Sequence, residues 1–364
     1  MTEENEIKKE ETTVPASPSQ KDVVTSVSDK IEQFIADVPL SAPVPSLPIK
    51  RQLALISTMV FAIFAIGGVP LVADHLREGS GTESTAPATE GSETETAETG
   101  PIDPFENFSV TAGSALVYDI KRERLLYEKN PDERRPLASI TKLMTALVAH
   151  EIMDGGLIVP ITNEAIGQSG DSGLKEGERF TLDNLSDLIL LTSSNDGAFA
   201  LAAAAGRALD ESDPASAFVK AMNVRAKELG LTKTSFRNPT GLDISEEEAG
   251  AYGSARDVAT LLKYIFENER QILEETAEAA AEFNDLSGIR HDADNTNPVV
   301  DAIPGLIGSK TGYTTLSGGN LAVIFDAGVD RPIVVVVLSS SHSGRFGDVL
   351  RLVEAAREKL KSEE

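Results

Sequence analysis

The pattern of hydrophobic and polar positions separates a polar N-terminal part of this chain from a C-terminal part with the periodicities of a packed domain. Residues 1–52 are mostly polar and charged and lack sustained apolar periodicity, which predicts a disordered tail. Residues 74–106 are dominated by an acidic, Ser- and Thr-rich stretch of low complexity, which predicts a flexible tether. The apolar spacings of strands and helices follow it, so we expect one folded domain over residues 107–364.

Between the tail and the tether, residues 53–73 contain no charged side chain. A helix of ~20 apolar residues is long enough to cross a bilayer. Lys50 and Arg51 precede this segment, whereas only Arg77 follows closely, so the positive-inside rule places the N-terminus in the cytoplasm and the domain outside. We therefore predict a single-pass protein of the cell membrane with one transmembrane helix; a buried core helix and a cleaved signal peptide are the alternatives.

Within the domain, the periodicities predict strands at both ends and helices between them. Val110–Asp119 and Leu125–Lys129 flank a turn, as in a β-hairpin. Near the other end, Asn320–Asp326 is a further strand, and Pro332–Ser339 contains an unbroken Ile, Val and Leu run that indicates burial on both faces. Helical spacing covers Ser139–Met153, Leu182–Leu191, Asp196–Leu209, Phe218–Leu229, Asp257–Phe266 and Phe346–Leu360. This order predicts an α/β domain whose two ends share one sheet and enclose a helical insertion.

Composition narrows the possible chemistry. The 58 acidic and 33 basic residues give a net charge of −25, which argues against nucleic-acid partners because phosphate contacts need clustered Lys and Arg. The chain has no cysteine, which excludes disulfides, thiolate metal sites and a cysteine nucleophile. Its four histidines lack the spacing of metal ligands, so we expect no metal and no other cofactor.

Ser139 and Lys142 open one of the predicted helices, in the sequence Ser-Ile-Thr-Lys. Their spacing places both side chains on one helix face, where a lysine of lowered pKa can activate the serine hydroxyl as a nucleophile. Free N–H groups at the helix start favour a developing oxyanion. The same spacing recurs at Ser172 and Lys175, but in a Gly-rich polar loop, so we interpret that copy as a surface turn.

Ser193 and Asn195 lie in the sequence Ser-Ser-Asn between two predicted helices. Ser193 can pass a proton between Lys142 and a leaving amine, and Asn195 can bind a backbone amide of a peptide substrate. Helix capping is the competing interpretation, because Ser and Asn are common cap residues.

Lys310, Thr311 and Gly312 precede the predicted strand Asn320–Asp326. Lys310 and Thr311 can hold a substrate carboxylate, and the charge of Lys310 can lower the pKa of Lys142. Gly312 leaves room for a ligand against an edge strand, where an added peptide would pair with backbone groups near Tyr313. Each motif is weak alone; their order makes an acyl-transfer enzyme the favoured interpretation.

The motifs and their surroundings resemble the serine D-alanyl-D-alanine carboxypeptidases of peptidase family S11, the low-molecular-weight penicillin-binding proteins. The resemblance covers roughly residues 107–360. It is carried by Ala138–Leu147 around the nucleophile, by Ser-Ser-Asn-Asp-Gly-Ala from Ser193, by Phe236–Leu242, and by Gly308–Thr314.

This resemblance implies a β-lactamase/transpeptidase-like fold: an antiparallel sheet flanked by helices, with a helical subdomain. It implies that Ser139 attacks the penultimate D-Ala of a peptidoglycan stem pentapeptide, with Lys142 as base and Ser193 helping to protonate the departing D-Ala. β-Lactams would acylate Ser139 as covalent inhibitors. The residues that the resemblance assigns to substrate binding are Asn195, Lys310, Thr311, Gly312 and Tyr313.

Two residues depart from the family's pattern: Ser194 stands where a Gly is usual, and Ser309 where an Ile or similar residue is common. A D,D-endopeptidase with the same site remains an open alternative. A β-lactamase would need a Glu-x-x-Leu-Asn segment, which is missing between Asn195 and Lys310. A non-catalytic module that binds peptidoglycan or penicillin is the remaining alternative, against which the intact motifs argue.

Overall fold

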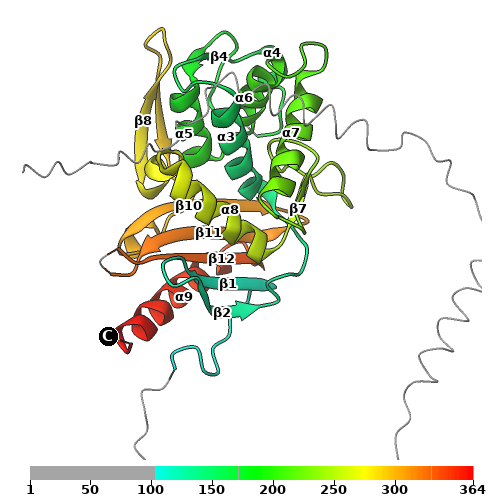
Figure 1. The fold of residues 1–364 in the computed structure, drawn as a ribbon. Helices are drawn as coiled ribbons and strands as arrows, with labels where there is room; N and C mark the ends of the chain where they lie inside the picture. Colours follow the sequence, from blue (N-terminus) through cyan, green and yellow to red (C-terminus); the bar gives the residue numbers. More distant parts are fainter. Residues whose placement is uncertain (1–102, 171, 329, 364) are drawn as a thin grey trace, which may run out of the picture. The chain divides into compact units, whose positions relative to one another are not determined.

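The computed structural model describes residues 103–363, except positions 171 and 329 (Figure 1). The predicted tail and transmembrane helix, which together make up residues 1–73, lie outside the described residues, as does the tether up to residue 102. Among the residues that are described, no helix is both long enough and apolar enough to cross a membrane.

A five-stranded antiparallel sheet is the base of the domain, in the order β10-β11-β12-β1-β2 (Figure 1). Its strands are β1 (Ser114–Asp119), β2 (Arg124–Lys129), β10 (Leu306–Thr314), β11 (Gly318–Asp326) and β12 (Pro332–Ser340). The predicted hairpin is β1–β2, and β12 pairs with β1, so the prediction of one sheet built from both ends of the domain is confirmed. Strand β10, which carries Lys310 and Gly312, lies at a sheet edge.

Strand β12 explains why the sheet is covered on both faces. Val335 and Val337 belong to the core that packs against α9 (Gly344–Lys361), whereas Val334 and Val336 belong to the core shared with α8 (Ala255–Asn268). Because successive side chains of a strand point to opposite faces, the unbroken apolar run needs a helix on each side. The predicted burial of this strand on both faces is confirmed.

The helical subdomain surrounds α3 (Thr141–Ile152), in which every residue from Thr141 to Ala149 is buried. The helices around it are α4 (Asn163–Ile166), α5 (Leu182–Thr192), α6 (Asn195–Arg207) and α7 (Pro214–Glu228). The predicted helices are confirmed, with ends displaced by a few residues. Thr181 caps α5 and Ser194 caps α6 by accepting hydrogen bonds from backbone N–H groups of the first helical turn.

Short elements complete the fold. The strands are β3 (Arg135–Pro136), β4 (Ile158–Pro160), β5 (Arg179–Thr181), β6 (Ser235–Phe236), β7 (Ala251–Gly253), β8 (Ala280–Asn284) and β9 (Arg290–Asp294). The 3-10 helices are η1 (Ala138–Ile140), η2 (Arg270–Ala277) and η3 (Val300–Ala302). The β8–β9 hairpin was not predicted from the sequence, because each strand buries only one of its five side chains and so lacks an apolar alternation.

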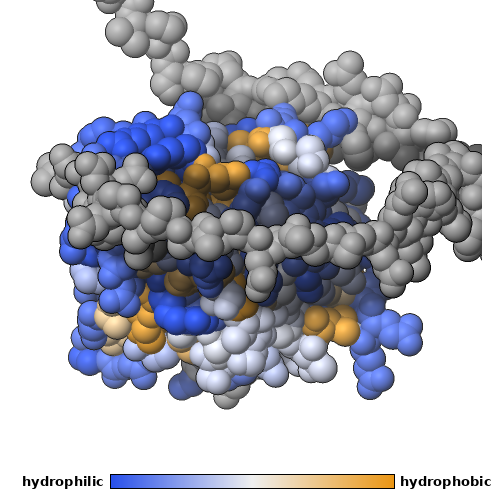
Figure 2. All heavy atoms as spheres, turned by 90° about the horizontal axis from the view of Figure 1, so that it is seen from below, coloured by the Kyte–Doolittle hydropathy of each residue, from blue (hydrophilic) through white to orange (hydrophobic). Residues whose placement is uncertain are grey.

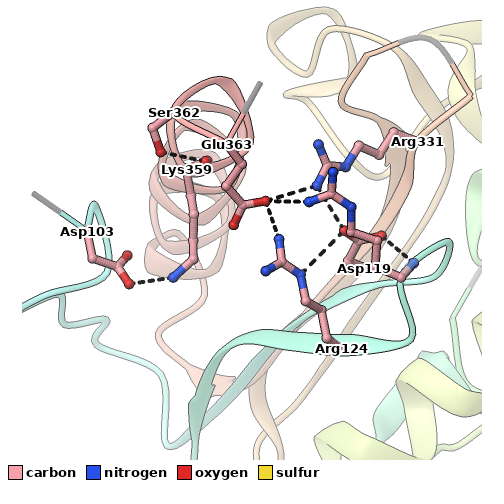
Figure 3. Close-up of polar contacts among 8 residues, drawn as sticks. Asp103, Asp119, Arg124, Arg331, Lys359, Ser362 and Glu363 are labelled. Atoms are coloured by element: carbon pink, nitrogen blue, oxygen red, sulfur yellow. Dashed lines mark hydrogen bonds and ion pairs between the residues drawn. The ribbon is translucent and has the colours of Figure 1, made fainter. Parts of the chain in front are cut away.

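The first and last described segments are joined by ion pairs (Figure 3). Lys359 of α9 pairs with Asp103, and Glu363 pairs with Arg124 and Arg331, which both also reach Asp119 at the end of β1. Asp103, the first described residue, is therefore already in contact with the domain. On the face seen from below in Figure 2, the described residues are mostly hydrophilic, and apolar residues form separate patches.

Candidate active site

Ser139 lies in η1, the turn of 3-10 helix directly before α3. Lys142 Nζ is 2.8 Å from Ser139 Oγ, 2.7 Å from Asn195 Oδ1 and 2.9 Å from the carbonyl oxygen of Thr240. The latter two oxygens only accept hydrogen bonds, so they engage two hydrogens of the amine. In the neutral amine the remaining position is a lone pair that faces the Ser139 hydroxyl, which is the arrangement required of a general base.

The electrostatic environment favours this neutral form. Lys142 is 0% exposed, and its burial, together with the nearby charge of Lys310, holds the pKa of Lys142 well below its ordinary value. Lys310 is 1% exposed, and its burial and the charge of Arg345 lower the pKa of Lys310 to about 7. The charge of Lys310 therefore acts on Lys142, as the sequence indicated.

The backbone around Ser139 is held by two other parts of the chain. Asn320 of β11 donates from Nδ2 to the carbonyl oxygens of Pro136 and Leu137, at 3.0 Å each. On the other side, Gly241 has a φ of +80° and packs against Ala138, whose carbonyl oxygen would collide with a Cβ atom at position 241. The nucleophile is thus fixed between the sheet and the segment Phe236–Leu242.

Ser193 and Asn195 occupy the junction of α5 and α6. Ser193 is the left-handed C-cap of α5 with a φ of +63°, and its hydroxyl has no hydrogen bond to another described residue. Asn195 begins α6; its Oδ1 accepts from Lys142 and its Nδ2 donates to the carbonyl oxygen of Ser169, at 2.7 Å each. Asn195 thus positions the base, a role that the sequence did not reveal.

Strand β10 places the third motif beside η1. Lys310 and Thr311 are buried, and Thr311 Oγ1 shares a 2.7 Å hydrogen bond with Thr296 Oγ1. A Cβ atom on Gly312 would lie 2.9 Å from the carbonyl oxygen of Leu137 and 3.2 Å from the N atom of Ser139. The glycine therefore permits close approach of η1, whereas the sequence suggested room for a ligand. Tyr313 is 51% exposed.

Arg345, in the first turn of α9, belongs to the site although no sequence pattern singled it out. It is only 5% exposed, and its Nη1 donates to the carbonyl oxygen of Gly312 at 3.0 Å. Its buried Nε has no hydrogen-bond partner among the described residues. A guanidinium left with an unused donor beside Lys310 favours an anionic ligand.

The segment Phe236–Leu242 also supplies a role that was missed. Asn238 Oδ1 accepts from the N–H groups of Thr240 and Gly241, at 3.2 and 2.7 Å. This turn presents the carbonyl oxygen of Thr240 to Lys142. A sequence can indicate that an asparagine side chain stabilises a turn. Which residue that turn contacts, here Lys142, is known only from the fold.

Two further interpretations from the sequence can be compared with the structure. Ser172 and Lys175 lie in a loop, where Ser172 Oγ donates to Asp196 Oδ2 at 2.8 Å and Lys175 is exposed, so the interpretation as a surface turn is confirmed. Ser309, the departure in β10, is buried and hydrogen-bonded to Thr276 and Asn297.

A mixed α/β fold that places a serine and a buried lysine in hydrogen-bond contact beside an edge strand defines a penicillin-binding, transpeptidase-like protein. The family described as D-alanyl-D-alanine carboxypeptidase, peptidase family S11, matches residues 97–341, and the chain belongs to this family.

Named relatives and solved structures agree. The chain is 34% identical over 251 residues to D-alanyl-D-alanine carboxypeptidase DacF of Bacillus subtilis, a match that covers 67% of this chain and 62% of that protein. It is 31% identical over 257 residues to a D-alanyl-D-alanine endopeptidase of Pseudomonas aeruginosa, covering 68% and 76%. Penicillin-binding protein D2 from Listeria monocytogenes, in its ampicillin-bound form, has a TM-score of 0.56 and 28% identity, with 68% and 98% covered.

Proposed function

We propose that this protein is a serine D,D-carboxypeptidase that removes the terminal D-Ala from peptidoglycan stem pentapeptides. The observation that carries the proposal is the 2.8 Å contact of Ser139 Oγ with a fully buried Lys142 whose pKa is lowered. A neutral lysine in this position has one evident use, which is to take the proton of the serine hydroxyl.

Each step of the proposed reaction can then be assigned to a residue of the site. Ser139 Oγ attacks the carbonyl carbon between the two D-Ala residues, and its proton moves to Lys142 Nζ. The N–H groups of Ser139 and Tyr313 bind the oxyanion, a role that the close approach of β10 to η1 supports. When the C–N bond breaks, the proton passes through Ser193 to the departing D-Ala. Water then cleaves the ester, giving one proton to Lys142, from which Ser139 regains its hydrogen.

The free carboxylate of the terminal D-Ala is bound on the side of the reacting carbonyl that faces Lys310. Lys310, the Thr311 hydroxyl and Arg345 offer two cations and one donor there, and the unused Nε of Arg345 adds another. A bound carboxylate favours the charged form of Lys310, whose pKa in the free site is about 7. Substrates that end in a carboxylate are therefore preferred over amidated ones. β-Lactams carry such a carboxylate beside a reactive carbonyl, so they acylate Ser139 and inhibit the enzyme.

A second candidate activity is D,D-endopeptidase cleavage of peptide cross-links by the same residues. The 31% identity to a protein named as an endopeptidase favours it. The two activities differ in the leaving group, which is a free D-Ala in the carboxypeptidase and an amine of a second stem peptide in the endopeptidase, so both substrates belong in the test.

The experiment uses the full chain in detergent with a fluorescent penicillin, followed by intact mass and peptide mapping. We expect one stable adduct on Ser139, its loss in Ser139→Ala, and release of D-Ala from a stem pentapeptide. Cleavage of a cross-linked dimer in preference to the pentapeptide favours the endopeptidase. Rapid turnover of the penicillin indicates a β-lactamase, and a folded protein without an adduct or D-Ala release indicates a binding module.

The location is part of the proposal. We infer from the charge-free run over residues 53–73 that the chain is anchored by one transmembrane helix, with its catalytic domain outside the cytoplasm. Protease added to intact spheroplasts should then digest the catalytic domain and spare residues 1–52. Protection of the domain in intact spheroplasts would contradict this topology.

A further inference from the structure

A cavity of about 580 Å³ opens beside the catalytic residues. Its walls come from residues 167–169, from Phe199 of α6, from α7, and from residues 237–240, 242 and 243. Two of the lining residues supply carbonyl oxygens to the site: Ser169 O accepts from Asn195, and Thr240 O accepts from Lys142. The cavity therefore shares a wall with the serine–lysine pair and has the size of a small-ligand pocket.

The direction of β10 connects this cavity to the proposed carboxylate site. From Lys310 the strand runs to Thr314, whose Oγ1 donates to Asp243 Oδ1 at 3.0 Å, and Asp243 lines the cavity. A peptide added antiparallel to this edge strand, with its terminal carboxylate at Lys310, has its upstream residues near Thr314. The residue that precedes the two D-Ala residues is therefore the part of the substrate closest to the cavity.

The lining has a distinctive charge pattern. Phe199, Val219 and Leu242 are half-buried and give the cavity apolar walls suited to methylene groups. Lys220 and Arg237 are exposed cations at its rim; Arg237 pairs with Glu248, whereas Lys220 has no ion pair among the described residues.

The acidic residue of the lining is already engaged. The two carboxylate oxygens of Asp243 accept hydrogen bonds from Thr314 Oγ1 and from the N–H group of Leu316. In a chain of net charge −25, Lys220, which has no ion pair among the described residues, and the ion-paired Arg237 at the mouth of an apolar cavity form a local site for an anion.

We propose that this cavity binds the side chain of the residue preceding D-Ala-D-Ala, and that Lys220 and Arg237 select a side chain that ends in a carboxylate. The proposal rests on the proposed function, because it assigns a substrate preference to that site. The apolar walls hold the aliphatic part of the side chain, and the rim cations hold its charged end.

The test compares three acylated tripeptides X-D-Ala-D-Ala that differ only in the end of the side chain of X. In 2-aminoadipate the chain ends in a carboxylate, in norleucine in a methyl group, and in lysine in an ammonium group. We expect kcat/KM for D-Ala release to be about two- to fivefold higher for aminoadipate than for norleucine, as for exposed charge pairs, and lowest for lysine. The preference should shrink as salt is added.

Substitutions at the rim test whether Lys220 and Arg237 cause the preference for aminoadipate. Lys220→Ala should bring the ratio of aminoadipate to norleucine towards one, and Lys220→Glu should reverse the preference towards lysine. Lys227→Ala removes the same charge from the same helix but does not line the cavity, so it should keep the wild-type ratio. Arg237→Gln tests the second cation independently of α7.

The outcomes separate the two proposals. Release of D-Ala from all three peptides at equal kcat/KM overturns the carboxylate selection and leaves the carboxypeptidase intact. The same holds if the preference exists but survives Lys220→Glu and Arg237→Gln unchanged. No release from any peptide, with the protein folded, contradicts the proposed function itself.

Discussion

Asn195 Oδ1 lies 2.7 Å from Lys142 Nζ, so the amide of the middle motif holds the catalytic base. The other end of the amide donates to Ser169 O, which fixes which face of Asn195 meets the lysine. The substrate-binding role inferred for this residue from the family stays a prediction.

Asn195→Ala should therefore impair acylation more than binding. Without the amide, Lys142 loses one of three partners, and its lone pair no longer has a fixed direction towards Ser139. We expect the rate of acylation by penicillin to fall about 10- to 1,000-fold, because part of the ~10²–10⁴-fold contribution of a general base is lost. Stopped-flow fluorescence with a labelled penicillin measures this rate.

Asn195→Asp is the matched control, because it keeps the shape and adds a negative charge. An anion beside Lys142 favours the protonated amine, so the pKa of Lys142 rises and acylation at neutral pH falls. Raising the pH should restore part of the rate in this variant but not in Asn195→Ala. Equal recovery in both would argue against the hydrogen bond as the cause.

The pH dependence of kcat/KM should have two limbs. Lys142 must be neutral, so the rate rises as the pH increases through its lowered pKa. Lys310 must be charged to hold the substrate carboxylate, so the rate falls as the pH increases past about 7. Because the charge of Arg345 lowers the pKa of Lys310, Arg345→Gln should move the falling limb to higher pH while weakening binding of the carboxylate. A falling limb that stays in place would remove Lys310 from this role.

Much of this fold can be predicted from the sequence because its signals are local. The apolar run of Pro332–Ser339 and the helical periodicity of Ser139–Met153 show which faces of each element are buried, whichever elements cover them. The spacing of Ser139 and Lys142 is likewise a property of one helical turn, and the structure brings the two atoms together.

The remaining features depend on contacts between distant segments. Arg345 stands 33 positions from Gly312, the residue to which it donates, and no spacing rule links them. The carbonyl of Thr240 reaches Lys142 across 98 positions. Backbone groups carry no residue signature, so such partners become visible only when the topology is known.

The lowered pKa of Lys310 also predicts how the free energy of unfolding depends on pH. The unfolded chain keeps Lys310 protonated up to its ordinary pKa, whereas the folded protein releases that proton at about 7. Between these values the unfolded state binds more protons, so this residue's contribution to the free energy of unfolding rises with pH. Below about pH 7 the cost of burying the charge is fully present.

Lys310→Met should remove that cost. Its free energy of unfolding should exceed that of the wild type by on the order of a few kcal/mol near pH 6, and the difference should shrink towards pH 10. Urea unfolding at several pH values measures it. Lys175→Met, which changes an exposed lysine, should alter the free energy of unfolding by less than about 0.5 kcal/mol. A constant difference for Lys310→Met would contradict the assigned pKa.

Gly241 connects the substrate loop to the nucleophile, and its replacement should affect both stability and chemistry. At a φ of +80° an alanine is strained, and its Cβ would collide with the carbonyl oxygen of Ala138, next to Ser139. We expect Gly241→Ala to lower the free energy of unfolding by about 2–4 kcal/mol, as overpacking and backbone strain do, and to slow acylation.

Gly230, with a φ of +72° and no atom within 4 Å of an added Cβ, is the matched control. Gly230→Ala has the backbone strain alone, about 1 kcal/mol, and should acylate at the wild-type rate. Similar losses in both variants would show that the close approach of Gly241 to Ala138 is unimportant for holding the serine.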